Sequence, residues 1–329
     1  MAFLVPNGYM GLCVETTRGT LNTGGTAVYI PVTAPQITPQ QKFLRDEALR
    51  GSPVAVYDQI QGVRNDEYEW KTYLYSDTLP NVMKALLGGT DTVTGTGPYT
   101  HTMKLLNSAT TGSQPSSYSL MDFDGANYFV MLGGQAASAN FTAGVDAAAD
   151  ATVKWITNPY TSATTASAPF TALSISTEHM IPAWDTTITV NSISLTYISN
   201  LELNIDRKTE PIFTMGTQAP HANFAGPIDV SGKFTAVVDS NADPFSTGTG
   251  YALGRLPETM ALLFTDPNDS GHTMTFTASA TQFQNVKRTK GKNYLELEVD
   301  FTCNADTTDA TTGYSPLAFA AINGQSTAY

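Results

Sequence analysis

Positive charge is scarce in this 329-residue sequence. Lys and Arg together number 17 against 29 Asp and Glu, and the formal net charge is −12. Proteins that grip nucleic acid carry basic patches, because lysine and arginine neutralise phosphates and release counterions. The composition therefore excludes a DNA-gripping surface, but it does not exclude a protein past which DNA moves.

Cysteine is scarce as well, and long apolar runs are missing. Cys13 and Cys303 lie near opposite ends of the chain, and no CxxC motif or histidine cluster accompanies them. This excludes the usual zinc patterns and leaves two free thiols. The N-terminal residues lack the basic region of a signal peptide, and no apolar run could span a membrane. We therefore expect a soluble protein made in a reducing cytoplasm, without membrane insertion.

Motifs of the common enzyme classes are also missing. The sequence contains no GxSxG, no Walker P-loop, no GxGxxG before a helix and no paired histidines of the metalloprotease type. Residues 122–127 resemble part of a calcium loop, but the distal glutamate is absent and Asp124-Gly125 favours a hairpin turn. We predict no catalytic residue, no cofactor and no metal, although carboxylates distant in sequence could still pair in space.

The sequence is rich in the period-two alternation of β-strands. From Leu195 to Asp206, apolar and polar residues alternate, which predicts one strand of about 40 Å with a buried face and a wet, acidic face. Asp66–Tyr75 and Tyr294–Cys303 alternate in the same way. With further short strands between residues 99 and 156, these patterns predict a mainly β protein.

A repeated order of features predicts an internal duplication. Capping residues precede Leu79–Leu87, an apolar stripe runs along it, and Gly88-Gly89 ends it, so a short helix is expected there. Leu256–Phe264 shares the LPxxM pattern and is predicted to form a second short helix, and the tripeptide His-Thr-Met follows each segment, at His101 and His272. Chance matches in a Leu- and Thr-rich chain remain the alternative interpretation.

The duplication divides the chain into five predicted parts. These are an N-terminal arm (1–30), a first β domain (31–157), a linker rich in Thr, Ser, Ala and Pro (158–187), a second β domain (188–310) and a C-terminal tail (311–329).

The polar strand faces are acidic, and ordinary solubility explains such faces in most one-sided sheets. A sharper interpretation is that they line a pore for DNA, where carboxylates repel phosphate weakly and each cation would add drag. Lysines and arginines cluster instead near connections, two of which are expected over Arg45–Gly62 and Arg207–Ala225. The clustered residues are Lys42, Arg45, Arg50 and Arg64, then Arg207 and Lys208, and finally Lys287, Arg288, Lys290 and Lys292. That placement suits contacts between subunits or turns.

The order of these features resembles phage tail tube proteins of the long, non-contractile type. The resemblance rests on residues 36–75 running into SDTLPNVMKALLGG, on PYTHTM, on ISLTYISNLELNID with its following connection, on IDVSGKFTAVV and on LELEVDFT. It implies a tail-tube-type β-barrel or sandwich with short flanking helices, present here in two similar copies. In such a family, strands of neighbouring subunits join into one inner barrel, which removes exposed strand edges.

Carried onto this chain, the resemblance implies two sets of functional residues. The candidates for lining the lumen are Glu67, Glu69, Glu202, Asn204 and Asp206. The candidates for ring-stacking loops are Arg45, Arg50, Tyr57, Arg207, Lys208, Phe213 and His221.

The implied partners are copies of the same chain, in rings that stack into a tube, with tail terminator, tape measure and distal tail proteins. Two tube domains per chain favour three chains per ring with a pseudo-six-fold wall, and a hexamer is the alternative. DNA would be a non-specific passing cargo. The protein would be assembled in the host cytoplasm and reside in the virion tail.

Two other functions stay open at this point. Another virion protein, such as a terminator, a capsid decoration protein or a baseplate hub component, would differ by not polymerising into tubes. A carbohydrate-binding or carbohydrate-cleaving β protein would need an exposed aromatic platform. Trp70 and Trp155 lie on apolar faces, so Trp184 alone could serve in that role.

Overall fold

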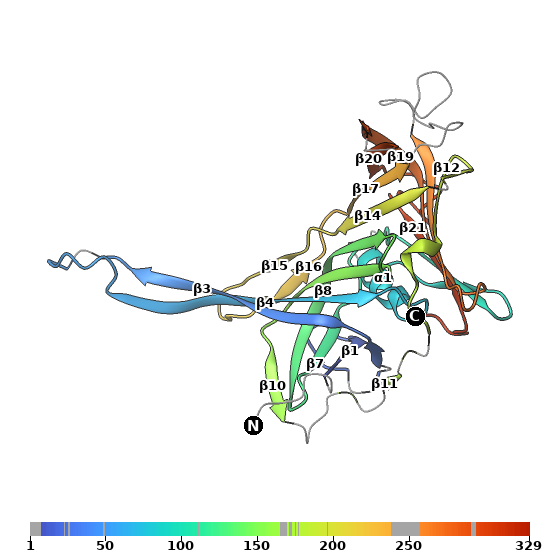
Figure 1. Cartoon of the computed structure of the whole chain (residues 1–329). Coiled ribbons are helices and arrows are strands. Elements are labelled where there is room, and N and C mark those ends of the chain that lie inside the picture. The colour runs from blue at the N-terminus through green and yellow to red at the C-terminus, as the bar shows by residue number, and fades with distance from the viewer. Residues whose placement is uncertain are drawn as a thin grey trace.

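The computed structural model shows a mainly β protein whose strands form a sandwich-like arrangement (Figure 1). The described residues are 8–22, 24–25, 27–48, 50–108, 110, 112–164, 170, 173–174, 176, 178–195, 197–237, 257–290 and 294–329. Within these ranges there is one α-helix, and none of the helical structure is long and apolar enough to cross a membrane.

A series of antiparallel strands forms one layer, which we call the wall. Its strands pair in the order β3 (Thr33–Asp46), β4 (Asp58–Tyr73), β9 (Asp150–Thr157), β8 (Asn127–Gly144), β14 (Ile198–Asp206), β17 (Asp229–Val237), β20 (Leu295–Cys303) and β19 (Thr273–Lys290). Figure 1 shows the wall running from the blue β3–β4 hairpin through β8, β14 and β17 to β19 and β20. It does not close on itself, because β3 and β19 lie at its opposite ends.

The remaining elements pack against the wall. In the first half they are β1 (Tyr9–Val14), β2 (Ala27–Ile30), β7 (Tyr118–Phe123), β10 (Thr161–Thr164), β11 (Leu173–Ser174) and α1 (Leu79–Leu87). In the second half they are η2 (Ala183–Asp185), β12 (Thr186–Val190), β13 (Ile193–Leu195), β18 (Glu258–Thr265) and β21 (Ala318–Asn323), joined by β5 (Thr92–Thr94) and β6 (Tyr99–Lys104). A separate ribbon consists of β15 (Glu210–Ile212) and β16 (Ala222–Phe224).

Helix α1 forms where the sequence predicts it. Pro80 lies in its first turn, where the missing N–H costs nothing, and Gly88 ends it in the left-handed region at φ 73°. The Gly88 amide donates to the Lys84 carbonyl at 2.8 Å. The apolar stripe is buried, and the helix packs against β8 and β6. The prediction of this helix is confirmed.

One hydrophobic core runs through both halves of the chain. Trp70 and Trp155 from the first half and Phe234 and Phe301 from the second belong to a single buried cluster. The rings of Phe141 and Phe276 meet across the halves with centroids 4.9 Å apart. The halves are therefore packed together rather than separated as two independent cores.

Two predictions for the second half were wrong. Residues 258–265 form strand β18 between β12 and β19 instead of a helix, because Met260, Leu262 and Phe264 alternate into the core. Leu256 lies outside the described residues. The predicted continuous strand from Leu195 is divided into β13, which pairs with β12, and β14, which pairs with β17 and β8.

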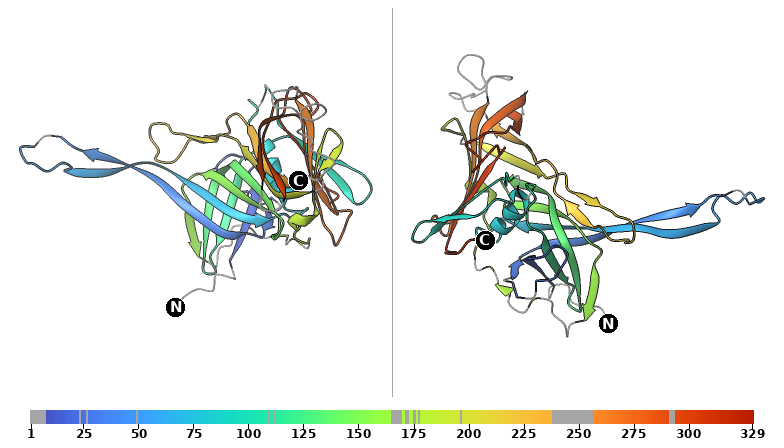
Figure 2. Two further views of the ribbon diagram at one scale, coloured as in Figure 1. Left: turned by 45° about the horizontal axis from the view of Figure 1, so that its top comes forward. Right: turned by 180° about the vertical axis from the view of Figure 1, so that it is seen from behind.

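The first half also differs from expectation at two places. The connection predicted over Arg45–Gly62 is shorter, because β3 continues to Asp46 and β4 begins at Asp58. The resulting hairpin projects far from the body in all views (Figures 1 and 2). Within the predicted N-terminal arm, β1 and β2 pair with each other and with β7 and β11, and Met10 is fully buried.

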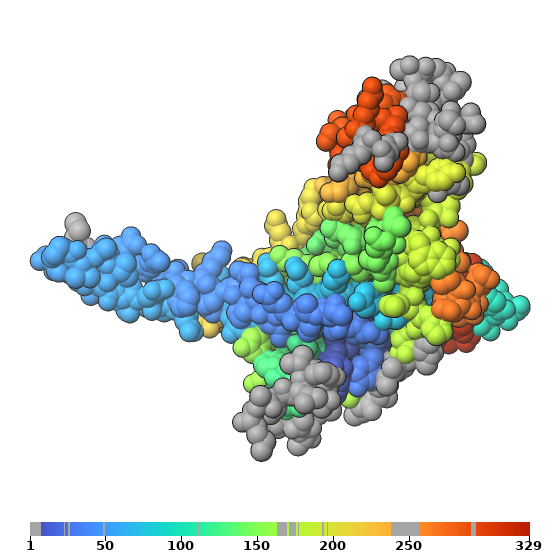
Figure 3. Space-filling model, viewed as in Figure 1, coloured from blue at the N-terminus to red at the C-terminus, as the bar shows by residue number. Residues whose placement is uncertain are grey.

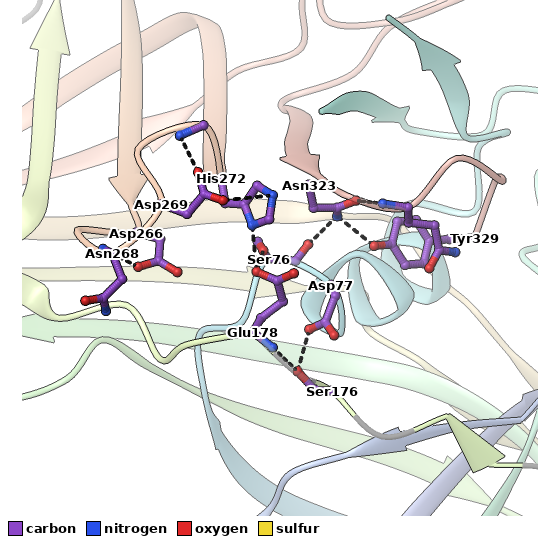
Figure 4. Close-up of polar contacts among 12 residues, drawn as sticks. Ser76, Asp77, Ser176, Glu178, Asp266, Asn268, Asp269, His272, Asn323 and Tyr329 are labelled. Carbon is purple, nitrogen blue, oxygen red and sulfur yellow. Dashed lines mark hydrogen bonds and ion pairs between the residues drawn. The ribbon is translucent and has the colours of Figure 1, made fainter. Parts of the chain in front are cut away.

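A polar cluster ties distant segments of the chain together (Figure 4). Glu178, from the predicted linker, accepts hydrogen bonds from Ser76 Oγ at 3.2 Å and from His272 Nδ1 at 2.6 Å. Asn323 Nδ2 donates to the Ser76 carbonyl at 2.6 Å and lies 2.7 Å from the Tyr329 hydroxyl. The C-terminal residues are thus built into the body of the protein.

Candidate functional site

The polar face of the wall is the candidate functional site. Strand alternation creates it: in β14, Leu201, Leu203 and Ile205 are buried, and the residues between them point the other way. The same alternation on the other strands brings acidic side chains onto this face: Glu67, Glu69, Asp150, Glu202, Asp206, Asp229, Glu296, Glu298 and Asp300.

The wall face also carries lysines, each paired with a carboxylate on a neighbouring strand. The paired atoms lie 2.8 Å apart in Lys71–Asp150, Lys154–Glu67 and Lys233–Glu202, and 3.5 Å apart in Lys287–Glu298. Cations are therefore found on the wall face as well as near the connections. Sequence alone could not reveal these pairs, because they depend on the cross-strand register.

The Lys233–Glu202 pair shows the electrostatics of this face. The hydrogen bond from Lys233 lowers the pKa of Glu202 below its ordinary value, and the same contact raises the pKa of Lys233. Asn140 Nδ2 donates a further hydrogen bond to Glu202 at 3.2 Å. An ion-paired lysine offers less free positive charge than an isolated one, so the face remains acidic overall.

The lumen-lining candidates lie on this one face. Glu67 and Glu69 are on β4, and Glu202, Asn204 and Asp206 are on β14. Strands β9 and β8 separate the two groups. The structure thus places all five residues on a common surface, but as two separate rows.

The β3–β4 hairpin carries the first set of stacking candidates. Arg45 lies on β3, while Arg50 pairs with Asp46 and lies 5.1 Å above the Tyr57 ring. The hairpin also exposes large apolar side chains that the sequence analysis did not single out: Phe43, Val54, Leu44 and Ile60 are 50%, 54%, 64% and 62% exposed. Figure 3 shows this hairpin as a bare arm beyond the body. Exposed apolar patches of this kind mark surfaces that contact other proteins.

The second set of stacking candidates lies between β14 and β17 and is less accessible. Arg207 is buried and donates to the Ser113 carbonyl at 3.2 Å, so it fixes the connection onto its own chain. Lys208 is exposed and pairs with Asp229, His221 is exposed, and Phe213 is half-buried. Met215 at the tip of this connection is fully exposed.

The sequence matches the protein family described as phage tail tube protein over residues 6–303. The chain belongs to this family. A search of curated proteins finds no match to the sequence. Family membership makes this a structural protein of the virion tail that assembles with copies of itself in a tube and works with other tail proteins. It also points to a non-enzymatic role.

Away from the wall, the His101 side chain of this tail tube protein has structural partners. Both ring nitrogens of His101 are engaged, Nδ1 with Asp91 at 2.7 Å and Nε2 with the Gln325 carbonyl at 2.9 Å. Within the described ranges, no group of three His, Cys, Asp or Glu side chains could hold a metal ion. The hairpin turn predicted at Asp124 is confirmed, because its carboxylate accepts the amides of Ala126 and Asn127.

Proposed function

We propose that this protein forms rings that stack into the tail tube, with the polar face of the wall lining a lumen through which the genome passes. The observation that carries this proposal is the acidic face with its ion-paired lysines. DNA phosphates would find no free row of cations to bind there, so the duplex would slide with little drag. Genome delivery would then be passive.

The wall also supports a proposal for ring symmetry. Its strand order β3-β4-β9-β8 is followed by β14-β17-β20-β19, and in each group the last two strands in space come in reversed sequence order. We infer that each group is one tube unit, corresponding to the domains 31–157 and 188–310. Three chains would then supply six units to a ring, with six chains as the alternative.

Ring stacking would use the β3–β4 hairpin. Its exposed apolar residues and its reach beyond the body suit a contact with the next ring, where burial of Phe43, Leu44 and Ile60 would be favourable. The connection 207–228 would contribute less, since much of it is bonded to its own chain.

Negative-stain electron microscopy at rising protein concentration tests the assembly. Rings and tubes are expected, and three-fold averaging of end views should hold for a trimeric ring. Particles that remain single or form only one unstacked ring would contradict tube formation and favour a terminator or decoration protein.

The lumen assignment needs a separate test in virions. Glu69→Lys should leave tube assembly unchanged and slow DNA ejection, because Glu69 is exposed on the wall face and a new cation there would attract phosphate. Asp269→Lys, on the exposed loop between β18 and β19, is the matched charge reversal away from the wall. Equal ejection rates for both variants and the parent would overturn the lumen assignment.

A further inference from the structure

The structure contains one joint between the two wall units, and that joint specifies how two copies of the chain should meet. Inside the chain, β8 of the first unit pairs with β14 of the second, with Thr142 opposite Glu202, Asn140 opposite Asn204 and Ser138 opposite Asp206. Among the described strands, β3 pairs with β4 alone, and β19 beyond Thr281 pairs with β20 alone. The wall therefore has one filled joint and two matching open edges.

The two units correspond residue by residue through their bulges. The β8–β9 ladder shifts between Ala136 and Ser138, and the β19–β20 ladder shifts between Phe283 and Asn285. Superimposing these shifts places Asn285 at the position of Ser138. Lys287 then corresponds to Asn140, and Thr289 to Thr142.

The same correspondence can be followed to the other edge. Trp155 faces Tyr68 and Phe301 faces Gly232, so Tyr68 and Gly232 are equivalent. Their partners on the next strand, Ile37 and Leu203, are equivalent in turn.

The neighbours of Ile37 on β3 follow from this match. Gln36, Thr38 and Gln40 take the places of Glu202, Asn204 and Asp206. Both open edges can thus be aligned with the filled joint without any free choice of register.

We propose that β19 of one copy pairs antiparallel with β3 of the next copy, with Thr289 opposite Gln36, Lys287 opposite Thr38 and Asn285 opposite Gln40. This proposal rests on the proposed ring and names its contact surface. It commits to a second copy of the same chain as the partner.

Burial at the two edges supports this joint. Ile37 and Val286 are partly buried at the margins of the core, whereas their counterparts in the filled joint, Leu203 and Ala139, are 1% and 0% exposed. Gln36, Gln40, Asn285 and Thr289 are exposed in the single chain. A neighbouring copy would complete the burial that the internal joint already shows.

The prolines of β3 also fit an edge strand. The Arg207 amide donates to the Ala137 carbonyl and the Val145 amide to the Ser199 carbonyl, so odd-numbered residues of β14 form the hydrogen-bonded pairs with β8. Pro39 corresponds to Ile205 in this class. Its ring nitrogen therefore faces the open edge, where it leaves the β4 ladder intact. In the proposed joint this one position would donate no amide hydrogen bond to β19.

Paired cysteines test the register directly. Because the proposed pairs belong to the non-hydrogen-bonded class, their Cα atoms should lie about 4.5 Å apart, within the range that a disulfide spans. The double variant Gln36→Cys/Thr289→Cys should form intermolecular disulfides under mild oxidation. A denaturing non-reducing gel should show a ladder that ends at the number of chains in one ring.

Control variants separate the register from general proximity. The offset pair Gln36→Cys/Lys287→Cys is diagonal and should cross-link at least about ten times more slowly. The second direct pair, Gln40→Cys/Asn285→Cys, should behave like the first. Each single variant should give no ladder, since Cys13 and Cys303 are buried and burial raises the pKa of both thiols.

The outcomes distinguish this inference from the proposed function. Rings or tubes that form normally while the offset pair cross-links faster than both direct pairs would overturn the register and leave the tube intact. Absence of rings, tubes and cross-links at every concentration would overturn both.

Discussion

The two wall units share a backbone plan but not the side chains that fill it. Both have the same strand order and a shift of register at the same place on the last strand of the unit, β8 or β19. At equivalent positions, the first unit has Tyr68 and Trp155, and the second has Gly232 and Phe301. The comparison teaches that cross-strand register is preserved between the units, while the side chains that face each other at this position are both smaller in the second unit.

The largest expected effect comes from emptying the shared core. Trp155→Ala and Phe301→Ala should each lower the free energy of unfolding by about 3–5 kcal/mol, because both side chains are at most 1% exposed. Since one core cluster includes both residues, each variant should shift a single cooperative unfolding transition. Urea denaturation followed by circular dichroism measures this.

The matched control for these variants is Trp184→Ala. Trp184 is 65% exposed, so its loss should change the unfolding free energy by less than about 0.5 kcal/mol. Two separate transitions, each moved by only one of the core variants, would show that the units are independent after all.

A smaller effect should follow from adding one methyl group at Gly232. A Cβ atom there would lie 2.3 Å from the Glu202 carbonyl oxygen and 2.4 Å from a ring carbon of Phe301. Gly232→Ala should therefore cost about 1–3 kcal/mol of stability through overpacking, although the first unit holds a tyrosine at the equivalent place. The test compares the melting temperature of Gly232→Ala with that of the control Gly144→Ala, because a Cβ at Gly144 would meet no atom closer than 4.0 Å. Equal melting temperatures for both variants would contradict the predicted overpacking at Gly232.

In the layers that cover the wall, Asp122 on β7 carries a carboxylate that burial affects. Burial, with a contribution from Asp124, raises the pKa of Asp122 to about 6. The folded protein therefore binds more protons than the unfolded chain between about pH 4 and pH 6, so ionised Asp122 costs stability at neutral pH. Asp122→Asn should raise the unfolding free energy at pH 8 by about 1–3 kcal/mol, and the difference should fade towards pH 4.

Asp124→Asn is the control with the opposite sign. The Asn127 amide and other backbone donors lower the pKa of Asp124, so its charge stabilises the fold above its unfolded pKa. This variant should be less stable than the parent at pH 8, and the loss should disappear in acid. A destabilising Asp122→Asn at pH 8 would refute the assigned cost of burial.

Sequence patterns predicted the parts of this fold in which local signals are complete. Helix α1 has an apolar stripe, a proline in its first turn and a glycine at its end. The alternation in β14 placed Leu201 and Glu202 on opposite faces of the strand. Residues 258–265 show the limit of this approach. The run ALLF is apolar at every position, so period two is hidden, and pairing with β12 and β19 decides the structure.

The candidate site could be predicted only in part for a similar reason. The carboxylates of the wall follow from alternation within single strands. Their lysine partners do not, because Lys154 meets Glu67 only through the pairing of β9 with β4, which are distant in sequence. The exposed apolar residues of the hairpin were missed in part because Ile60 was expected in the connection Arg45–Gly62 rather than on a paired end of β4.

The smallest expected effect concerns the Lys233–Glu202 ion pair, which has no equivalent in the first unit. Lys233 faces Glu202 in the second unit, whereas the equivalent residues in the first unit are Glu69 and Gln36. Glu202→Gln makes the two units more alike and should cost about 0.2–1 kcal/mol, since both partners are substantially exposed. The lowered pKa of Glu202 means that this contribution is present above the unfolded pKa and is lost as pH falls through the folded value.

Urea denaturation at pH 7 and pH 3, in low and high salt, measures this contribution. Glu69→Gln is the matched control. Among the described residues, the ion pairs of the wall do not include Glu69, so this variant should change the unfolding free energy by close to zero. A loss for Glu202→Gln that persists at pH 3 would mean that the amide disturbs the β8–β14 joint itself, through the Asn140 hydrogen bond, rather than through charge. In that case hydrogen bonds rather than charge hold the β8–β14 joint. The uncharged Gln36, at the equivalent position on β3, would then resemble Glu202 in the role that matters for the joint.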